Sequence, residues 1–135
     1  MEKSRADYYI LMVEDDAELA NFNQIVLKRA GFVAQHAANG EQAIAIIDQR
    51  RPDVMLLDLN LPGMSGWQVL EYMNGRYGEN SVPVIVTTAQ SDPANRVVGK
   101  LQEVYRYLVK PFERRELLAA IESALGISAL NPPTG

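Results

Sequence analysis

A buried strand and the turn that follows it are encoded by Val54-Met-Leu-Leu-Asp58-Leu-Asn60-Leu-Pro62-Gly63-Met-Ser-Gly66. The apolar run ends in a single aspartate, and proline and glycine follow closely. A continuous apolar run of this length is typical of a strand buried on both faces of a parallel sheet. Asp58 is therefore predicted to lie at the carboxyl end of a central strand, where open α/β sheets bind their ligands. A carboxylate buried there is costly unless another group pairs with it.

The composition is that of an ordinary globular domain. The 135 residues suffice for one domain with its own core, and 47% of them are hydrophobic while 22% are charged. The net charge of -4 argues against direct nucleic-acid binding by this chain, because such binding needs a basic surface. The absence of cysteine excludes disulfides, thiolate metal sites and a cysteine nucleophile.

The sequence also lacks signals for export or membrane insertion. Residues 1–7 are polar and have no apolar region of the kind found in secretion signals. No apolar run approaches the roughly 20 residues that span a bilayer. We therefore expect a cytoplasmic location and no membrane partner.

Apolar patterns predict five strands that alternate with five helices. The strands are expected at residues 8–13, 32–37, 54–57, 82–86 and 104–109. Residues 32–37 are partly polar, which favours a position toward an edge of the sheet. The alternation predicts an α/β fold with a single doubly wound parallel sheet, covered by helices on both faces. The domain is expected to cover residues 8–126, with 1–7 as a polar N-terminal extension and 127–135 as a C-terminal tail or the start of a linker.

The predicted helices carry apolar residues three or four positions apart. One face of the first helix is expected to contain Leu19, Phe22, Val26 and Ala30, with Gly31 ending the helix. A turn at Asn39-Gly40 precedes the second helix, which is expected to end near Arg51-Pro52, and Ser65 is expected to cap the third. The fourth is expected to begin at Asp92-Pro93, and the fifth to run from about Glu113 to Leu125.

Polar side chains suited to chemistry follow four of the predicted strands. The first strand is followed by Glu14, Asp15 and Asp16, the third by Asp58, the fourth by Thr87 and Thr88, and the fifth by Lys110. Because the carboxyl ends of parallel strands share one edge, we expect these groups to converge. Carboxylates that lie this close cannot all stay ionised unaided. Either a cation binds beside them or one of them takes a proton.

The donor types indicate a magnesium-dependent phosphoryl-transfer site. Oxygen ligands without histidine or cysteine select a hard cation, and a partly open site suits Mg²⁺. Lys110 would hold an anionic oxygen, and Asp58 would attack in line to form an acyl phosphate. Taken singly, the acids could merely cap the first helix, and Asp16 could do only that. Thr87 could be an ordinary strand residue, but the joint arrangement favours the phosphoryl-transfer site.

The sequence resembles the response-regulator receiver domains of two-component signalling over residues 8–126. The matching motifs are Val13-Glu14-Asp15-Asp16, Asp58-Leu-Asn60-Leu-Pro62-Gly63-Met-Ser-Gly66, Pro83-Val-Ile-Val-Thr-Thr88-Ala89 and Tyr107-Leu-Val-Lys110-Pro111-Phe112. The resemblance implies a flavodoxin-like strand order of 2-1-3-4-5. It also implies a signalling phosphoacceptor rather than an enzyme, one that promotes its own phosphorylation and dephosphorylation.

The resemblance assigns roles to the site residues. Asp58 would accept a phosphoryl group from a phosphohistidine on a sensor histidine kinase or a phosphotransfer protein. Glu14, Asp15 and Asp58 would bind Mg²⁺ together with the backbone carbonyl of Asn60. Lys110 would contact the phosphoryl oxygens, and the Lys110-Pro111 bond is expected to be cis.

The resemblance also implies a switch. Thr88 would move toward the phosphoryl group and Tyr107 would turn inward behind it, which would reshape the surface of the fourth helix, fifth strand and fifth helix. Asn60 and Gln90 occupy positions that tune phosphate lifetime in the family. The downstream target is not indicated by the sequence.

Two departures from the family pattern concern that surface. Glu103-Val-Tyr105-Arg106 replaces an acidic run that often precedes the fifth strand, and Ala120 leaves the fifth helix without an obvious ionic partner. Dimerisation through acid–base pairs is therefore not expected, whereas Tyr105, Val97 and Val98 could form a more apolar contact surface or a partly buried edge. His36 and Trp67 are interpreted as structural.

Three other functions compete with this interpretation. An aspartyl-phosphate phosphatase of the haloacid-dehalogenase type also uses an aspartate after a strand, but it needs a second acid where Asn60 stands. A flavin-binding module would need a phosphate-binding loop after the first strand, where Glu14 and Asp15 are found. A receiver that signals without phosphorylation would not need the full set of site residues.

Overall fold

The computed structural model describes residues 3–78, 82–89 and 104–128. Its elements are β1 (Tyr9–Val13), α1 (Ala17–Arg29), β2 (Val33–Ala37), α2 (Gly40–Gln49), β3 (Val54–Asp58), α3 (Gly66–Tyr77), β4 (Val84–Ala89), β5 (Arg106–Lys110) and α5 (Arg114–Leu125). A short 3-10 helix at Arg5–Asp7 precedes β1. The helix predicted to begin at Asp92-Pro93, and with it Val97 and Val98, lies outside the described residues. In the described part of the chain, no helix is long and apolar enough to cross a membrane.

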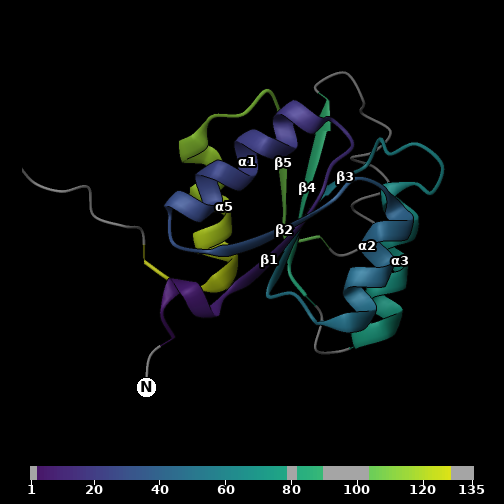
Figure 1. Ribbon diagram of the computed structural model, residues 1–135, viewed down its shortest axis with the longest axis horizontal. Coiled ribbons are helices and arrows are strands. Elements are labelled where there is room, and N and C mark those ends of the chain that lie inside the picture. The colour runs from purple at the N-terminus through teal and green to yellow at the C-terminus, as the bar shows by residue number, and fades with distance from the viewer. Residues whose placement is uncertain (1–2, 79–81, 90–103, 129–135) are drawn as a thin grey trace, which may run out of the picture.

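The five strands form one parallel sheet in the order β2-β1-β3-β4-β5, which confirms the predicted fold class and strand order. Helices α1 and α5 cover one face of the sheet, and α2 and α3 cover the other (Figure 1). The partly polar strand β2 lies at an edge, as predicted. Every residue of β1 and β3 is buried, because helices cover both faces of these strands.

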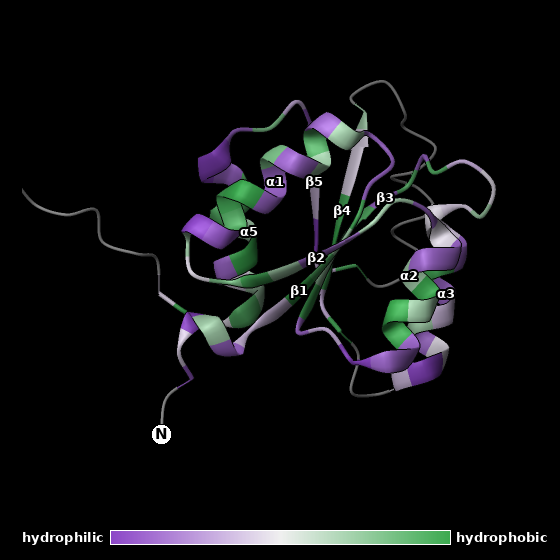
Figure 2. Ribbon diagram, in the orientation of Figure 1, coloured by the Kyte–Doolittle hydropathy of each residue, from purple (hydrophilic) through white to green (hydrophobic). Residues whose placement is uncertain are grey.

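Two apolar clusters join the sheet to its helices. Alternate residues of β1 and β3 project to opposite faces, so Ile10 and Leu56 contribute to one cluster while Leu11 and Leu57 contribute to the other. Val69, Leu70 and Met73 of α3 are fully buried in the second cluster. Figure 2 shows the same pattern, with hydrophobic residues concentrated in the strands and polar residues on the outer sides of the helices.

Side chains and glycines fix the ends of the helices. Asp16 caps α1, and its carboxylate accepts hydrogen bonds from the backbone N–H groups of Glu18 and Leu19 at 3.0 and 3.2 Å. Ser65 caps α3, as predicted. Gly31 follows α1 with a φ of 97°, a conformation that favours glycine.

The turn predicted at Asn39-Gly40 is wrong at its second residue, because α2 already begins at Gly40, with Asn39 as its N-cap. The Asn39 side chain accepts a hydrogen bond from the backbone N–H of Gln42 at 2.8 Å and caps the helix. The dipeptide is typical of a turn, but its amide oxygen also makes asparagine a favoured N-cap. The other end of α2 is at Gln49, short of the predicted end near Arg51-Pro52.

The predicted inward position of Phe22 is also wrong, since its side chain is 43% exposed. The buried residues of α1 are Ala20, Asn23, Val26 and Leu27. This stripe is rotated by about one residue from the predicted one, and a small alanine and a buried asparagine make its apolar pattern weak. Phe22 instead lines a groove with Leu19 and Phe112.

Residues before β1 pack against the domain. The Arg5 guanidinium forms an ion pair with Glu122 of α5 at 2.6 Å and donates to the Ser128 carbonyl at 3.0 Å. It also lies 4.9 Å from the centre of the Phe32 ring. These contacts tie the N-terminal segment to the end of α5.

A pair of glycines in α3 gives a test of the packing around Asp58. A methyl group added at Gly66 would lie 2.5 Å from the Asp58 carbonyl oxygen, whereas one added at Gly75 would meet no atom within 4 Å. We expect Gly66→Ala to lower the free energy of unfolding by about 2 kcal/mol or more because the backbone must shift. Gly75→Ala, in the same helix, should raise it by up to about 1 kcal/mol. Urea unfolding would measure both, and equal effects of the two substitutions would contradict this packing.

Candidate functional site

The described site residues converge at the carboxyl edge of the sheet, as predicted. Glu14 follows β1, Asp58 ends β3 and Lys110 ends β5. In the sheet register, Asp58 is paired with Thr87, and Thr88 with Val109. The alternation of strands and helices therefore brings residues from distant parts of the sequence to one edge.

Lys110 connects the two buried carboxylates. Its Nζ lies 2.8 Å from Oε1 of Glu14 and 3.1 Å from Oδ2 of Asp58. The side chains of both acids are 4% exposed, and that of Lys110 is 25% exposed. Such burial is unfavourable for an isolated carboxylate, so the ammonium group offsets part of the desolvation cost. The bond from Lys110 to Pro111 is cis, as expected.

Three carboxylates form a candidate metal site. Glu14, Asp15 and Asp58 each offer an oxygen, and these oxygens lie within 4.8 Å of one another. Asp15 is exposed, so one side of the cluster is open to solvent. Three acids against one nearby lysine leave excess negative charge, and the donor set contains only oxygen. These properties fit a hard divalent cation.

Burial and neighbouring charges separate the pKa values of the two buried acids. Burial is the largest reason that the pKa of Glu14 is raised to about 7, and Asp58 raises it further while Lys110 lowers it. Burial also tends to raise the pKa of Asp58, but hydrogen bonds from Glu14, the Asn60 backbone and Lys110 outweigh it and lower that pKa. The Asn60 N–H donates to Oδ1 of Asp58 at 3.0 Å. Asp58 is therefore the carboxylate that stays ionised, while Glu14 holds a proton most readily.

Lys110 is held in its charged form by the same acids. Burial tends to lower the pKa of the Lys110 ammonium, but the hydrogen bond to Glu14 and the charge of Asp58 outweigh this effect and raise it. The site thus keeps a cation beside Asp58 at neutral pH.

The residues predicted to form the switch lie near this edge. Thr88 is 1% exposed, and its hydroxyl donates a long hydrogen bond of 3.4 Å to the Ala89 carbonyl. Tyr107 packs against the apolar cluster on the α2 and α3 face. Its buried hydroxyl has no hydrogen-bond partner in the described part of the chain, and burial raises its pKa. Gln90 lies outside the described residues.

One contact at the site is not indicated by any motif in the sequence. A ring nitrogen of His36 lies 2.6 Å from the Glu14 carbonyl oxygen, within hydrogen-bond distance. The register of β1 and β2, which pairs His36 with Met12, places the imidazole there, and the strand order was the signal that could have indicated it. Trp67 is half-buried and packs against the cluster on the α3 side, in agreement with a structural role.

The fold and the acidic site can be compared with known proteins. The family model of the response regulator receiver domain matches residues 10–122. The DNA-binding response regulator MtrA of Mycobacterium tuberculosis is 38% identical over 116 residues, which cover 86% of this chain and 50% of MtrA. The sensory transduction protein RegX3 of Mycolicibacterium smegmatis is 38% identical over 126 residues, which cover 93% of this chain and 54% of RegX3.

Solved structures agree with these sequence relatives. The chemotaxis protein CheY4 of Vibrio cholerae matches with a TM-score of 0.81 and 27% identity, over 87% of this chain and 98% of that chain. The chain spans about half the length of the curated relatives named above. A family match over most of the chain agrees with the strand order and with the acidic cluster at the sheet edge. The chain therefore belongs to the response regulator receiver domain family of two-component signalling.

Proposed function

We propose that Asp58 is the phosphoacceptor and takes its phosphoryl group from a phosphohistidine on a sensor histidine kinase or a phosphotransfer protein. The observation that carries this proposal is the contact of 3.1 Å between Lys110 and an Asp58 carboxylate whose pKa is lowered. An ionised carboxylate beside a fixed cation is a suitable nucleophile for phosphoryl transfer.

In the proposed reaction, an oxygen of Asp58 forms a bond to phosphorus as the bond between phosphorus and the histidine nitrogen breaks. The products are an acyl phosphate on Asp58 and a free histidine on the donor. Lys110 moves from pairing with the carboxylate to pairing with the phosphoryl oxygens. Hydrolysis of the acyl phosphate returns the site to its starting state, and Asn60 and Gln90 are proposed to set the rate of that step.

Glu14, Asp15, Asp58 and the backbone carbonyl of Asn60 are the proposed ligands of Mg²⁺. When bound, the ion would neutralise negative charge on the transferring group. The raised pKa of Glu14 supports this assignment, because a buried acid in an anionic cluster is ionised more easily when a cation replaces its proton. Binding of Mg²⁺ at neutral pH should therefore release a proton from Glu14.

The signal is proposed to leave the site through Thr88 and Tyr107. A hydrogen bond from the Thr88 hydroxyl to the phosphoryl group would replace its long bond to Ala89. The space that Thr88 leaves would admit Tyr107, and the surface around β5 and α5 would change with it. The Tyr107 hydroxyl has no hydrogen-bond partner among the described residues, so no hydrogen bond in that part of the chain opposes this movement.

The proposed outcome is control of a partner protein or of a further domain. MtrA is a DNA-binding response regulator, and the chain matches half of its length. The net charge of -4 favours a signalling role for this region over direct contact with DNA.

Phosphorylation by a small phosphodonor with Mg²⁺ tests the acceptor. We expect a mass gain of one phosphoryl group in the wild-type protein and none in Asp58→Asn. Asp16→Asn is a matched control, because asparagine also caps helices and should keep the mass gain. Phosphorylation that persists in Asp58→Asn, or turnover of the donor without an accumulated phosphoprotein, would contradict the proposal.

Removal of the Lys110 ammonium group should slow the phosphorylation of Asp58. We expect Lys110→Gln to lower the phosphorylation rate by about 100-fold, because no fixed charge then stabilises the phosphoryl oxygens. Lys28→Gln, which removes an exposed lysine in the last turn of α1, should leave the rate unchanged. Stopped-flow fluorescence or quench-flow mass spectrometry would measure both rates, and a decrease shared by the two variants would point to a general charge effect.

The stability of the metal-free protein should depend on pH through Glu14. Its pKa is raised from 4.5 to about 7 in the folded state, so the native protein binds more protons than the unfolded chain between these values. This contribution to stability is fully present below about pH 4.5 and is lost as the pH rises through about 7.

We therefore expect the wild-type protein to lose on the order of 1–3 kcal/mol relative to Glu14→Gln between about pH 5 and about pH 8 in EDTA. Urea unfolding at each pH gives the comparison. Parallel pH profiles for the two proteins would show that Glu14 does not titrate in this range.

A further inference from the structure

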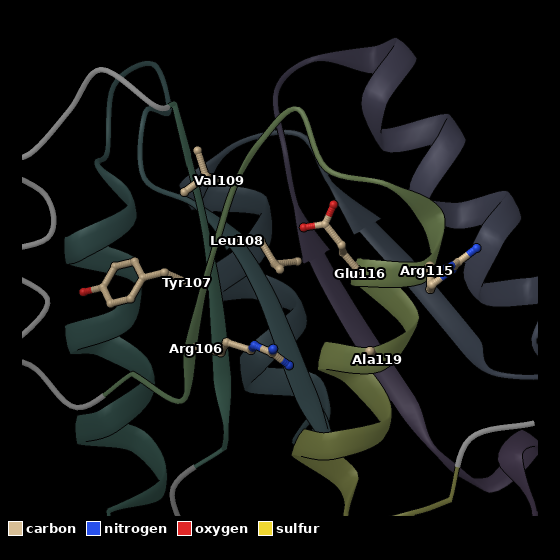
Figure 3. A pocket seen from close by; sticks show the side chains of 7 residues that line it. All are labelled: Arg106, Tyr107, Leu108, Val109, Arg115, Glu116 and Ala119. Atoms are coloured by element: carbon tan, nitrogen blue, oxygen red, sulfur yellow. The ribbon is translucent and has the colours of Figure 1, made fainter.

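An open groove of about 430 Å³ lies between β5 and α5. Its lining residues are Arg106, Tyr107, Leu108 and Val109 from β5 and Arg115, Glu116 and Ala119 from α5 (Figure 3). Lys110, which binds the acids of the phosphoacceptor site, is not among them. The groove is therefore distinct from the acidic site, and residues 106–109 of β5 form one of its walls.

That strand is the last in the strand order of the described sheet. In the described part of the chain, β5 pairs only with β4. The backbone N–H of Tyr105 donates to the Val84 carbonyl at 2.9 Å. Because alternate residues of a parallel strand turn their backbone groups to the same side, Arg106 and Leu108 turn theirs away from β4. An edge of this kind offers hydrogen bonds to an added strand.

The side chains in the groove form a mixed surface. Figure 3 shows Arg106 and Leu108 pointing from β5 toward α5, whereas Tyr107 points to the opposite side. Glu116 points from α5 toward β5, and one of its oxygens accepts a hydrogen bond from the Glu113 N–H at 3.1 Å. Arg106 is exposed and forms no ion pair within the described residues.

We propose that this groove binds a short extended segment of a partner protein that adds to the edge of β5. The segment would place an acidic side chain against Arg106 and, two residues along, an apolar side chain against Leu108 and Ala119. This spacing follows from strand geometry, because side chains two residues apart share one face. Backbone hydrogen bonds would supply affinity, and the acidic side chain would supply selectivity.

A second copy of the chain is a poorer occupant. Lys110 of β5 is paired with Glu14 and Asp58, so an edge formed by two copies of this strand would bring the cation of Arg106 against a second β5 strand that offers no acid. The acidic partner is favoured because it neutralises the guanidinium that the described residues leave unpaired. A charged residue on an edge strand can also serve only to prevent association, and the experiment separates that role from binding.

The test uses the full chain without phosphodonor or Mg²⁺, so its result does not depend on phosphoryl transfer. The probe is a fluorescently labelled peptide, Thr-Glu-Thr-Val-Thr, and the comparison peptide carries lysine in place of glutamate. Fluorescence anisotropy should show that the wild-type protein binds the glutamate peptide about tenfold more tightly than the lysine peptide. Arg106→Glu should reverse this preference.

Arg114→Glu is the matched control. It makes the same charge change on an exposed residue of α5 that does not line the groove, and glutamate is well tolerated in the first turn of a helix. We expect it to change peptide affinity by less than about twofold. A peptide with methylated backbone amides should bind at least about tenfold more weakly, because it cannot donate to the strand.

The opposite results would overturn the proposal. Absence of binding by the wild-type protein would leave Arg106 with a protective role alone. Equal losses in Arg106→Glu and Arg114→Glu would indicate attraction by general charge. Full binding of the methylated peptide would exclude strand addition. Sedimentation that shows a dimer broken by Arg106→Glu would identify a second copy as the occupant.

Discussion

The pairing of one lysine with two buried carboxylates is the interaction on which the site depends. Lys110 ends β5, Asp58 ends β3 and Glu14 follows β1, so the ammonium reaches past the end of β4 to meet both acids. Removal of Lys110 would leave the buried carboxylates without a compensating charge, which is strongly unfavourable. The contact therefore requires the strand order β1-β3-β4-β5, and the fold supplies that order through its continuous apolar strands.

The same cluster is imperfectly balanced, and this imbalance has a functional meaning. Three carboxylates lie close to a single ammonium, and the pKa of Glu14 rises to about 7 as a result of burial and of Asp58. A structure selected only for stability would replace one of these acids with a neutral residue. Retaining them keeps Asp58 ionised and leaves a place for a cation beside it.

The sheet and most of the site could be predicted because their signals are local. Buried parallel strands have continuous apolar runs, and an acid, hydroxyl or lysine at the end of such a run is visible in the sequence. The face of α1 could not be predicted, because the stripe with Phe22 and the stripe with Asn23 have nearly the same spacing. Asn23 is 1% exposed, and its side-chain oxygen has no hydrogen-bond partner among the described residues, so no sequence rule favours its burial.

Other features arise only from contacts between distant residues. The ion pair of Arg5 with Glu122 joins positions that are 117 residues apart in the sequence. The contact of His36 with the Glu14 carbonyl depends on the register of β1 and β2. Neither Arg5 nor His36 belongs to a motif, and an arginine or histidine in a polar stretch is ordinarily exposed. Such contacts can be identified only once the strand order and register are known.

Strand β5 contributes residues both to the proposed phosphoacceptor site and to the groove. Its last residue, Lys110, binds Asp58, and its first, Arg106, lies in the groove beside α5. Between them, Tyr107 projects to the other face with a buried hydroxyl that has no partner in the described part of the chain. In the proposed function, a phosphoryl group on Asp58 changes the partner of Lys110 at one end of a five-residue strand. Tyr107 lies between the two ends of the strand, so a change at the sheet edge has a short physical route to the groove.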